Sequence, residues 1–227
     1  CGYRYWLSRV CGFQPLLARE LGFGRLLHHL VAELARQAAS GREPGPEDVD
    51  RLVERSFYLP FAGTIPGMRL RESARRRVKA YVRGYGRELT RTVQPEMSFE
   101  VPLGDARLRG RVDLVLAVGE KGKRRVELID FKTAENRPPS EAHKNQLRLY
   151  AVAVERLGYE PVGLYVHDLD REAGGRVAVT DDARARSAFE DELRGLIEGI
   201  RAGRFDPAAS ATACSGCDFW AFCPHRA

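Results

Sequence analysis

The sequence predicts an α/β protein in which helices flank one small mixed β-sheet. Three observations lead to this prediction. Apolar residues recur at helical spacing between residues 21 and 90. The period then changes to the alternation that is typical of strands between residues 98 and 133. Helical spacing returns over residues 140–157 and is followed by further short strands, so helices and strands belong to one domain.

Three helices and the segments that connect them are predicted in the first half of the chain. Residues 21–39 place apolar side chains on one side, and we expect this helix to end at the breaker-rich residues 40–46. Residues 46–57 begin with proline and acidic residues, which are typical of a first helical turn. Residues 60–67 are predicted to form a loop, and residues 68–90 a long arginine-rich helix.

The middle of the chain is predicted to form strands. Residues 98–103 and 107–118 alternate between apolar and polar side chains. Residues 119–123 have the composition of a hairpin turn, which would lead into a third strand over residues 125–133. This third strand is rich in valine, leucine, isoleucine and phenylalanine.

The last part of the chain returns to helix before it becomes irregular. A helix is predicted over residues 140–157 and a short strand over residues 161–168. Residues 176–179 are predicted to add an edge strand, and residues 181–202 to form a final helix. Residues 205–227 carry three cysteines and are predicted to be irregular.

Composition excludes several protein classes. The chain has 227 residues, of which 44% are hydrophobic and 30% charged, and these values argue against a disordered or collagen-like protein. No apolar run approaches the roughly 20 residues that a membrane-spanning helix needs. The net charge is +6, and 32 of the 37 basic residues are arginines. Arginine suits phosphate groups, so a polyanionic partner is one interpretation, and codon composition is the other.

Five cysteines lie near the two ends of the chain. An odd number, with none in the long stretch between, makes a poor disulfide framework. We therefore expect a reducing, cytoplasmic compartment and a metal or cluster role for these residues. Because the chain opens with Cys1 and not with methionine, we also expect a fragment or processed product of a longer protein.

The strongest chemical feature is a pair of aspartates on neighbouring strands, followed by a lysine. Side chains alternate along a strand, so Asp130 and Lys132 share one face and Phe131 points away. A hairpin can bring Asp113 beside them. Two carboxylates and an ammonium suit a hard divalent cation with an activated water. A surface ion pair is the alternative, but the apolar flanks predict a strand buried on both faces, where polar groups need partners.

The order of three motifs resembles the PD-(D/E)xK nuclease superfamily, and within it the RecB-type exonuclease branch. The motifs are Gly110–Asp113, Ile129–Thr133, and a helix that carries Gln146 and Tyr150. Gln146 and Tyr150 lie four residues apart and so share a helix face. Asp130 stands where many relatives carry glutamate. The resemblance implies a restriction-endonuclease-like core with a helical N-terminal part and a C-terminal cysteine segment.

The resemblance also implies the residues of a nuclease site. Catalytic roles fall to Asp113, Asp130, Lys132, Gln146 and Tyr150. Ligands for Mg²⁺ or Mn²⁺ would be His28, Asp113, Asp130 and the backbone carbonyl of Phe131. His28 enters because Gly24 precedes it at the spacing of the branch, and its neighbour His29 lies on a different helix face. Arginines implied to contact the DNA backbone are Arg71, Arg75, Arg76, Arg109 and Arg111.

The cysteine spacing is similar to the iron–sulfur staple of AddB-type nucleases and CRISPR-associated RecB-like exonucleases. This similarity implies a [4Fe–4S] cluster held by Cys1, Cys214, Cys217 and Cys223. Tetrahedral Zn²⁺ is the alternative occupant, although zinc sites more often show two close pairs of ligands. Cys11 would be the spare cysteine, and an exchange of roles between Cys11 and Cys1 stays open.

These observations together predict one nuclease domain over residues 1–227. It would consist of a helical part (1–92), a catalytic α/β core (93–203) and a cluster-binding tail (204–227) that closes onto Cys1. The expected activity is metal-dependent hydrolysis of DNA, at single strands or duplex ends, in repair or recombination. A fused or separate helicase motor is an expected partner, since the chain carries no phosphate-binding loop of its own, and no membrane is expected.

Two other readings stay open. The first is a catalytically silent iron–sulfur module that clamps DNA. The second is a zinc-stapled protein-interaction domain, which leaves the buried acidic strand unexplained. The intact Asp113, Asp130 and Lys132 favour an active enzyme over both.

Overall fold

The computed structural model describes residues 1–13, 21–59, 64–119, 124–133, 139–170 and 175–227, and it confirms the predicted α/β class. The chain forms two compact units. The larger unit is built from residues 19–190, and the smaller from residues 1–18 together with residues 191–227. The predicted division of one domain into three parts stays a prediction.

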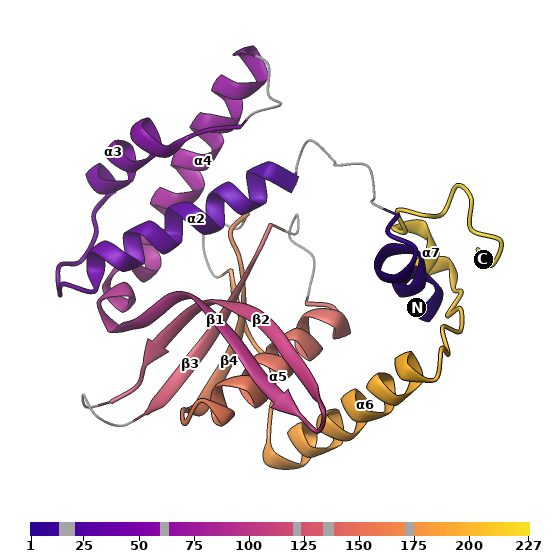
Figure 1. Ribbon diagram of the computed structural model, residues 1–227. Helices are drawn as coiled ribbons and strands as arrows, with labels where there is room; N and C mark the ends of the chain where they lie inside the picture. The colour runs from indigo at the N-terminus through magenta and orange to yellow at the C-terminus, as the bar shows by residue number, and fades with distance from the viewer. Residues whose placement is uncertain (14–20, 60–63, 120–123, 134–138, 171–174) are drawn as a thin grey trace. The chain divides into compact units, whose positions relative to one another are not determined.

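A five-stranded mixed sheet forms the centre of the larger unit (Figure 1). Its strands lie side by side in sequence order: β1 (Thr92–Leu103), β2 (Ala106–Ala117), β3 (Arg125–Lys132), β4 (Glu160–Asp168) and β5 (Arg176–Ala178). Neighbouring strands are antiparallel except for β3 and β4, which are parallel. Helix α5 (Glu141–Arg156) makes the crossover that a parallel pair requires.

Helices cover both faces of this sheet and enclose two apolar cores. On one face α2 (Leu21–Ala38) and α4 (Thr64–Tyr85) pack over residues such as Ile129 and Phe131 of β3, and α3 (Pro46–Ser56) packs against these two helices. On the other face α5 packs over Val126 and Leu128 of the same strand. Strand β3 is therefore apolar on both faces, as its sequence predicted.

Two prolines explain where the predicted boundaries were wrong. Helix α4 begins at Thr64, so the predicted loop is wrong for residues 64–67, and residues 60–63 lie outside the described chain. Pro66 falls in the first turn, where a missing N–H costs no helical hydrogen bond. Strand β1 begins at Thr92 and not at residue 98, because it is an edge strand that tolerates Pro95.

Other boundaries differ less. Helix α4 ends at Tyr85, and the 3₁₀ helix η2 (Gly86–Arg91) occupies the end of the predicted helix. The predicted hairpin turn at residues 119–123 lies, except for Gly119, outside the described residues.

The smaller unit brings together segments from opposite ends of the chain. Residues 1–10 form α1 (Gly2–Tyr5) and the π-helix η1 (Trp6–Val10), for which the sequence analysis made no prediction. Helix α6 (Ala183–Arg201) begins in the larger unit and ends in the smaller. The tail predicted to be irregular contains the short helix α7 (Ala211–Ser215). None of the helices in the described ranges combines the length and apolarity needed to cross a membrane.

A buried histidine lies in the core beneath α4. His167 of β4 is 2% exposed and meets the rings of Tyr81, Tyr85 and Phe131 edge-on. Its Nδ1 has no hydrogen-bond partner among the described residues. Burial, helped by the charge of Arg176, lowers the pKa of His167 to about 3. The fold therefore holds this imidazole neutral.

This histidine should make the fold sensitive to acid. Below about pH 6.5 the unfolded chain binds a proton at His167 that the folded chain refuses until about pH 3. The free energy of unfolding should thus fall by about 1.4 kcal/mol per pH unit across that window. In His167→Phe, urea denaturation between pH 7 and pH 4 should show a pH slope smaller by about this amount. Equal slopes for the two proteins would contradict the assignment.

Candidate active site

The candidate site lies where strands β2 and β3 separate. Their pairing ends at Leu114 and Ile129, so the next backbone groups have no partner across the ladder. The carboxylate of Asp113 takes that place, because its Oδ2 accepts a hydrogen bond of 2.8 Å from the N–H of Phe131. Asp113 is therefore fixed to the backbone of β3 beside Asp130.

Asp130 is a carboxyl group at the centre of the fold. It is 1% exposed, and burial raises its pKa to about 6. The ammonium of Lys132 opposes this rise, whereas the negative charge of Asp113 adds to it. Lys132 Nζ lies 2.8 Å from Asp130 Oδ2, but the approach lacks hydrogen-bond geometry, so this oxygen is buried without a hydrogen bond from the described residues. Because burial raises the pKa of Asp130 despite this ammonium, the carboxylate is suited to a further positive partner.

A chain of polar contacts runs from Lys132 to helix α5. Lys132 Nζ donates a hydrogen bond of 3.0 Å to Gln146 Oε1, and Gln146 Nε2 donates to the hydroxyl of Tyr150 at 2.5 Å. Burial raises the pKa of Tyr150, so its hydroxyl stays protonated at neutral pH. The two helical residues predicted to share a face are thus brought to Lys132, and they hold its ammonium between α5 and β3.

His28 approaches from the opposite layer, on helix α2. Its Nδ1 lies 3.4 Å from Asp113 Oδ1, and its ring meets Phe131 edge-on. Gly24 allows this approach, since a Cβ there would lie 3.1 Å from Thr133 Oγ1 at the end of β3. His29 is exposed and takes no part in these contacts.

The donor types suit a hard divalent cation, but their arrangement does not yet form a binding site. Among the described residues, no three His, Cys, Asp or Glu side chains are grouped so that they could hold a metal ion. Asp113 is engaged by Phe131 and His28, and Asp130 by Lys132. The predicted ligand set of His28, Asp113, Asp130 and the Phe131 carbonyl therefore stays a prediction.

The predicted DNA-binding arginines are distributed over two elements. On α4, Arg71 and Arg75 form ion pairs with Glu54 at 3.4 and 3.5 Å, and Arg76 also interacts with neighbouring groups. On β2, Arg109 pairs with Glu100 at 2.8 Å and Arg111 with Glu96 at 3.1 Å. The side chains of Arg109 and Arg111 remain 74% and 57% exposed.

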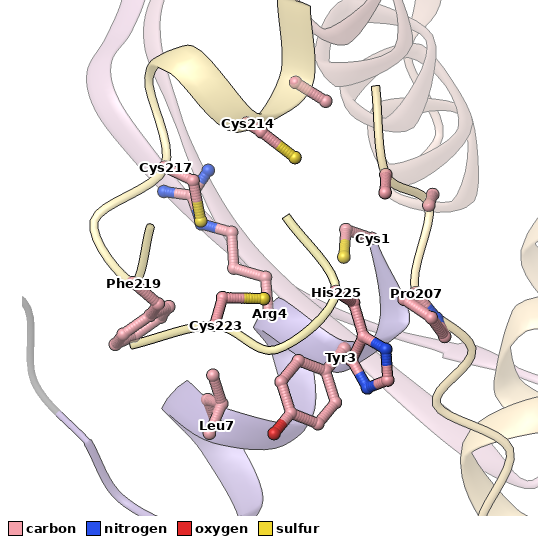
Figure 2. A pocket seen from close by; sticks show the side chains of 13 residues that line it. Cys1, Tyr3, Arg4, Leu7, Pro207, Cys214, Cys217, Phe219, Cys223 and His225 are labelled. Atoms are coloured by element: carbon pink, nitrogen blue, oxygen red, sulfur yellow. The ribbon is translucent and has the colours of Figure 1, made fainter. Parts of the chain in front are cut away.

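A second candidate site lies in the smaller unit. Four cysteines, Cys1, Cys214, Cys217 and Cys223, line a hollow of about 210 Å³. Figure 2 shows their sulfur atoms directed into this hollow, with Tyr3, Leu7 and Phe219 around them. All five cysteines are free, and Cys11 is exposed and does not line the hollow.

Gly2 brings Cys1 to the other three cysteines. Its N–H donates to the carbonyl of Asp206 at 3.0 Å. A Cβ at this position would lie 2.8 Å from the carbonyl carbon of Phe205, so only glycine fits. Arg4 adds an ion pair of 2.7 Å to Asp218.

Comparison with known proteins supports the assignment of the chain to a family. A family model for the PD-(D/E)XK nuclease superfamily matches residues 1–224. No curated protein matches the chain. A solved structure described as "Crystal structure of SSO0001" is similar at 21% sequence identity and a TM-score of 0.38. The similarity covers 59% of this chain and 61% of that one, which is less than two thirds of either.

The raised pKa of Asp130 should make the native site a source of instability. Between about pH 4 and pH 6 the folded chain binds a proton at Asp130 that the unfolded chain does not, so wild-type stability should fall as the pH rises. Asp130→Asn should therefore raise the free energy of unfolding by about 1–3 kcal/mol at pH 7.5.

Urea denaturation in the presence of a chelator measures this gain. It should shrink toward zero as the pH falls below about 4, where the wild-type carboxyl becomes protonated in the unfolded state as well as in the folded state. Glu127→Gln, on the same strand but the opposite face, serves as the control and should show no such pH-dependent gain. A pH-independent loss of stability in Asp130→Asn would contradict the prediction.

Proposed function

The chain belongs to the PD-(D/E)XK nuclease superfamily, and on that premise we propose that it hydrolyses DNA phosphodiester bonds with Mg²⁺ or Mn²⁺. Membership implies a nuclease. Beyond this, we propose that the substrate is DNA and that the cofactor is a divalent metal ion. The observation that carries this proposal is the buried carboxylate of Asp130, which is paired with Lys132, lies next to Asp113 and has a pKa that burial raises. A buried ionisable group whose charged form is destabilised, beside a specific charged partner, is typical of a functional site.

The metal would be held by His28, Asp113, Asp130 and the backbone carbonyl of Phe131. When bound, it would supply a Lewis acid for the phosphate and lower the pKa of a water molecule. The residues themselves prepare this role: Asp113 is anchored to the Phe131 N–H, and His28 is within 3.4 Å of it.

Lys132 is the proposed electrophilic residue of the reaction. Its ammonium is oriented by Asp130 on one side and by Gln146 on the other. In this position it would orient the attacking water and stabilise the negative charge that develops on the phosphate. Gln146 and Tyr150, joined by their own hydrogen bond, would position the strand that is cut.

Backbone contacts to DNA would come from Arg71, Arg75, Arg76, Arg109 and Arg111. Arg109 and Arg111 of β2 are more exposed than Arg71 and Arg75 of α4. Phosphates would replace the carboxylates that Arg71, Arg75 and Arg109 now contact. Binding should consequently weaken as salt concentration rises.

We also propose the branch of the superfamily, the biological role and the metal cluster. The order of motifs along the chain supports the RecB-type exonuclease branch, and with it a role in repair or recombination next to a fused or separate helicase motor in the cytoplasm. Four free thiols around one hollow support the [4Fe–4S] cluster, whose proposed role is to tie the two ends of the smaller unit together. Zinc is the competing occupant.

Cleavage of end-labelled single-stranded DNA tests the nuclease. With Mg²⁺ or Mn²⁺ the anaerobically purified protein should release label, and Asp130→Ala or Lys132→Ala should lower the rate by at least about a hundredfold. Glu127→Gln, an acidic residue on the other face of the same strand, should retain wild-type activity. Cleavage that survives Asp130→Ala would place the chemistry elsewhere.

A catalytically silent DNA clamp is the second candidate function. The exposed arginines of β2 favour it as much as they favour a nuclease, since both must hold DNA. The same assay separates the two, because a clamp would bind labelled DNA and leave it uncut with every metal.

Optical absorbance tests the cluster. The anaerobic protein should be brown with absorbance near 400 nm, and replacing Cys1, Cys214, Cys217 or Cys223 by serine should bleach it. Cys11→Ser is the matched control and should keep the colour, because Cys11 does not line the hollow. A colourless protein that contains zinc by metal analysis would refute the cluster and favour the zinc staple.

A further inference from the structure

The side chains of strand β2 change sides of the sheet at Asp113. Val112 lies in the core beneath α5, whereas Leu114 lies in the core beneath α2. In a regular strand these two residues would share a face, because side chains alternate. The backbone must therefore rotate at Asp113, and this rotation decides where its carboxylate points.

Glu96 of β1 lies directly across the ladder from Asp113. Pro95 pairs with Leu114 and Met97 with Val112, so Glu96 faces Asp113. Glu96 has a φ of +50°, the only positive φ of a non-glycine residue in the described chain. This left-handed conformation is unfavourable for a residue with a Cβ, and it persists only where neighbouring contacts hold it.

Two arginines from different elements hold Glu96. Arg36 of α2 donates to one carboxylate oxygen at 2.7 Å, and Arg111 of β2 lies 3.1 Å from the other. The hydrogen bond to Glu96 is the main cause that raises the pKa of Arg36. Arg36 lies eight residues after His28, which is a little over two turns along the same helix. Glu96 thus joins the helix that carries His28 to the strand that carries Asp113.

We propose that Glu96 is a positioning residue of the nuclease site. The carboxylate fixes α2 against β2 and thereby sets the approach of His28 to Asp113, and its left-handed backbone turns Asp113 toward β3. This inference rests on the proposed function, in which His28 and Asp113 hold the metal. Outer residues that orient metal ligands typically change metal affinity when they are replaced.

Glu100 of the same strand is a matched control. It also lies between two arginines, Arg107 at 2.7 Å and Arg109 at 2.8 Å. Both of these arginines belong to β2, so this second cluster joins only the two strands of one hairpin. Within the described chain, the ion pairs of Glu100 are with these two arginines and not with a residue of α2.

Single-turnover cleavage at saturating DNA tests the proposal. Glu96→Gln should raise the Mg²⁺ concentration for half-maximal rate by about tenfold. Glu100→Gln should leave it unchanged. In a His28→Ala background Glu96→Gln should add little, because the ligand that it positions is gone. Arg36→Gln, which breaks only the α2 half of the contact and leaves the turn at Glu96 in place, should reproduce the effect if Glu96→Gln fails to fold.

An activity-independent readout separates this inference from the proposed function. Mn²⁺ broadens the NMR signal of a nearby imidazole, so histidine-labelled protein reports metal binding at His28 directly. Glu96→Gln should need about tenfold more Mn²⁺ than wild type for the same broadening. If wild-type protein cuts no DNA but shows this difference, the positioning role stands and the nuclease fails. If wild type cuts DNA and the two glutamate variants behave alike in both assays, the positioning role is overturned and the nuclease stands.

Discussion

The site depends on one costly placement, that of the Asp130 carboxyl inside the sheet. A charge in this position must be matched by polar groups, and the surrounding residues supply them in sequence: Lys132, then Gln146, then Tyr150. This chain of contacts ties β3 to α5 at the edge where the strands end. The polar contacts of the site, together with the apolar core, therefore fix the position of α5 against β3.

The second layer of the fold reaches the same edge from the opposite side. Helix α2 carries His28 to Asp113, and a glycine one turn earlier lets the helix come close to the end of β3. Since β2 and β3 stop pairing at this point, side chains replace the missing backbone hydrogen bonds. Side chains from both helical layers, His28 of α2 and Gln146 of α5, thus meet the strands at this point.

Much of this arrangement could be predicted from local patterns, and the rest depends on contacts that leave no such pattern. Alternation along β3 predicted that Asp130 and Lys132 share a face, and helical spacing predicted the same for Gln146 and Tyr150. The boundaries of α4 and β1 were predicted wrongly, because in a sequence a proline in a first helical turn or on an edge strand cannot be told from one that ends the element. The role of Glu96 could not be predicted, since nothing in the sequence marks a glutamate whose backbone is left-handed. The metal ligands could not be placed by pattern, because their geometry depends on which partners Asp113 and Asp130 keep.

The smaller unit has a consequence for how the protein is made and how it is damaged. Its segments come from opposite ends of the sequence. The hydrogen bond from the Gly2 N–H to the Asp206 carbonyl links them, so the chain is closed by a non-covalent contact. During synthesis Cys1 must wait for the other three cysteines, so the hollow between them can form only after Cys223 has left the ribosome. If a protease cut the chain within the larger unit, the contacts inside the smaller unit would still hold the two fragments together.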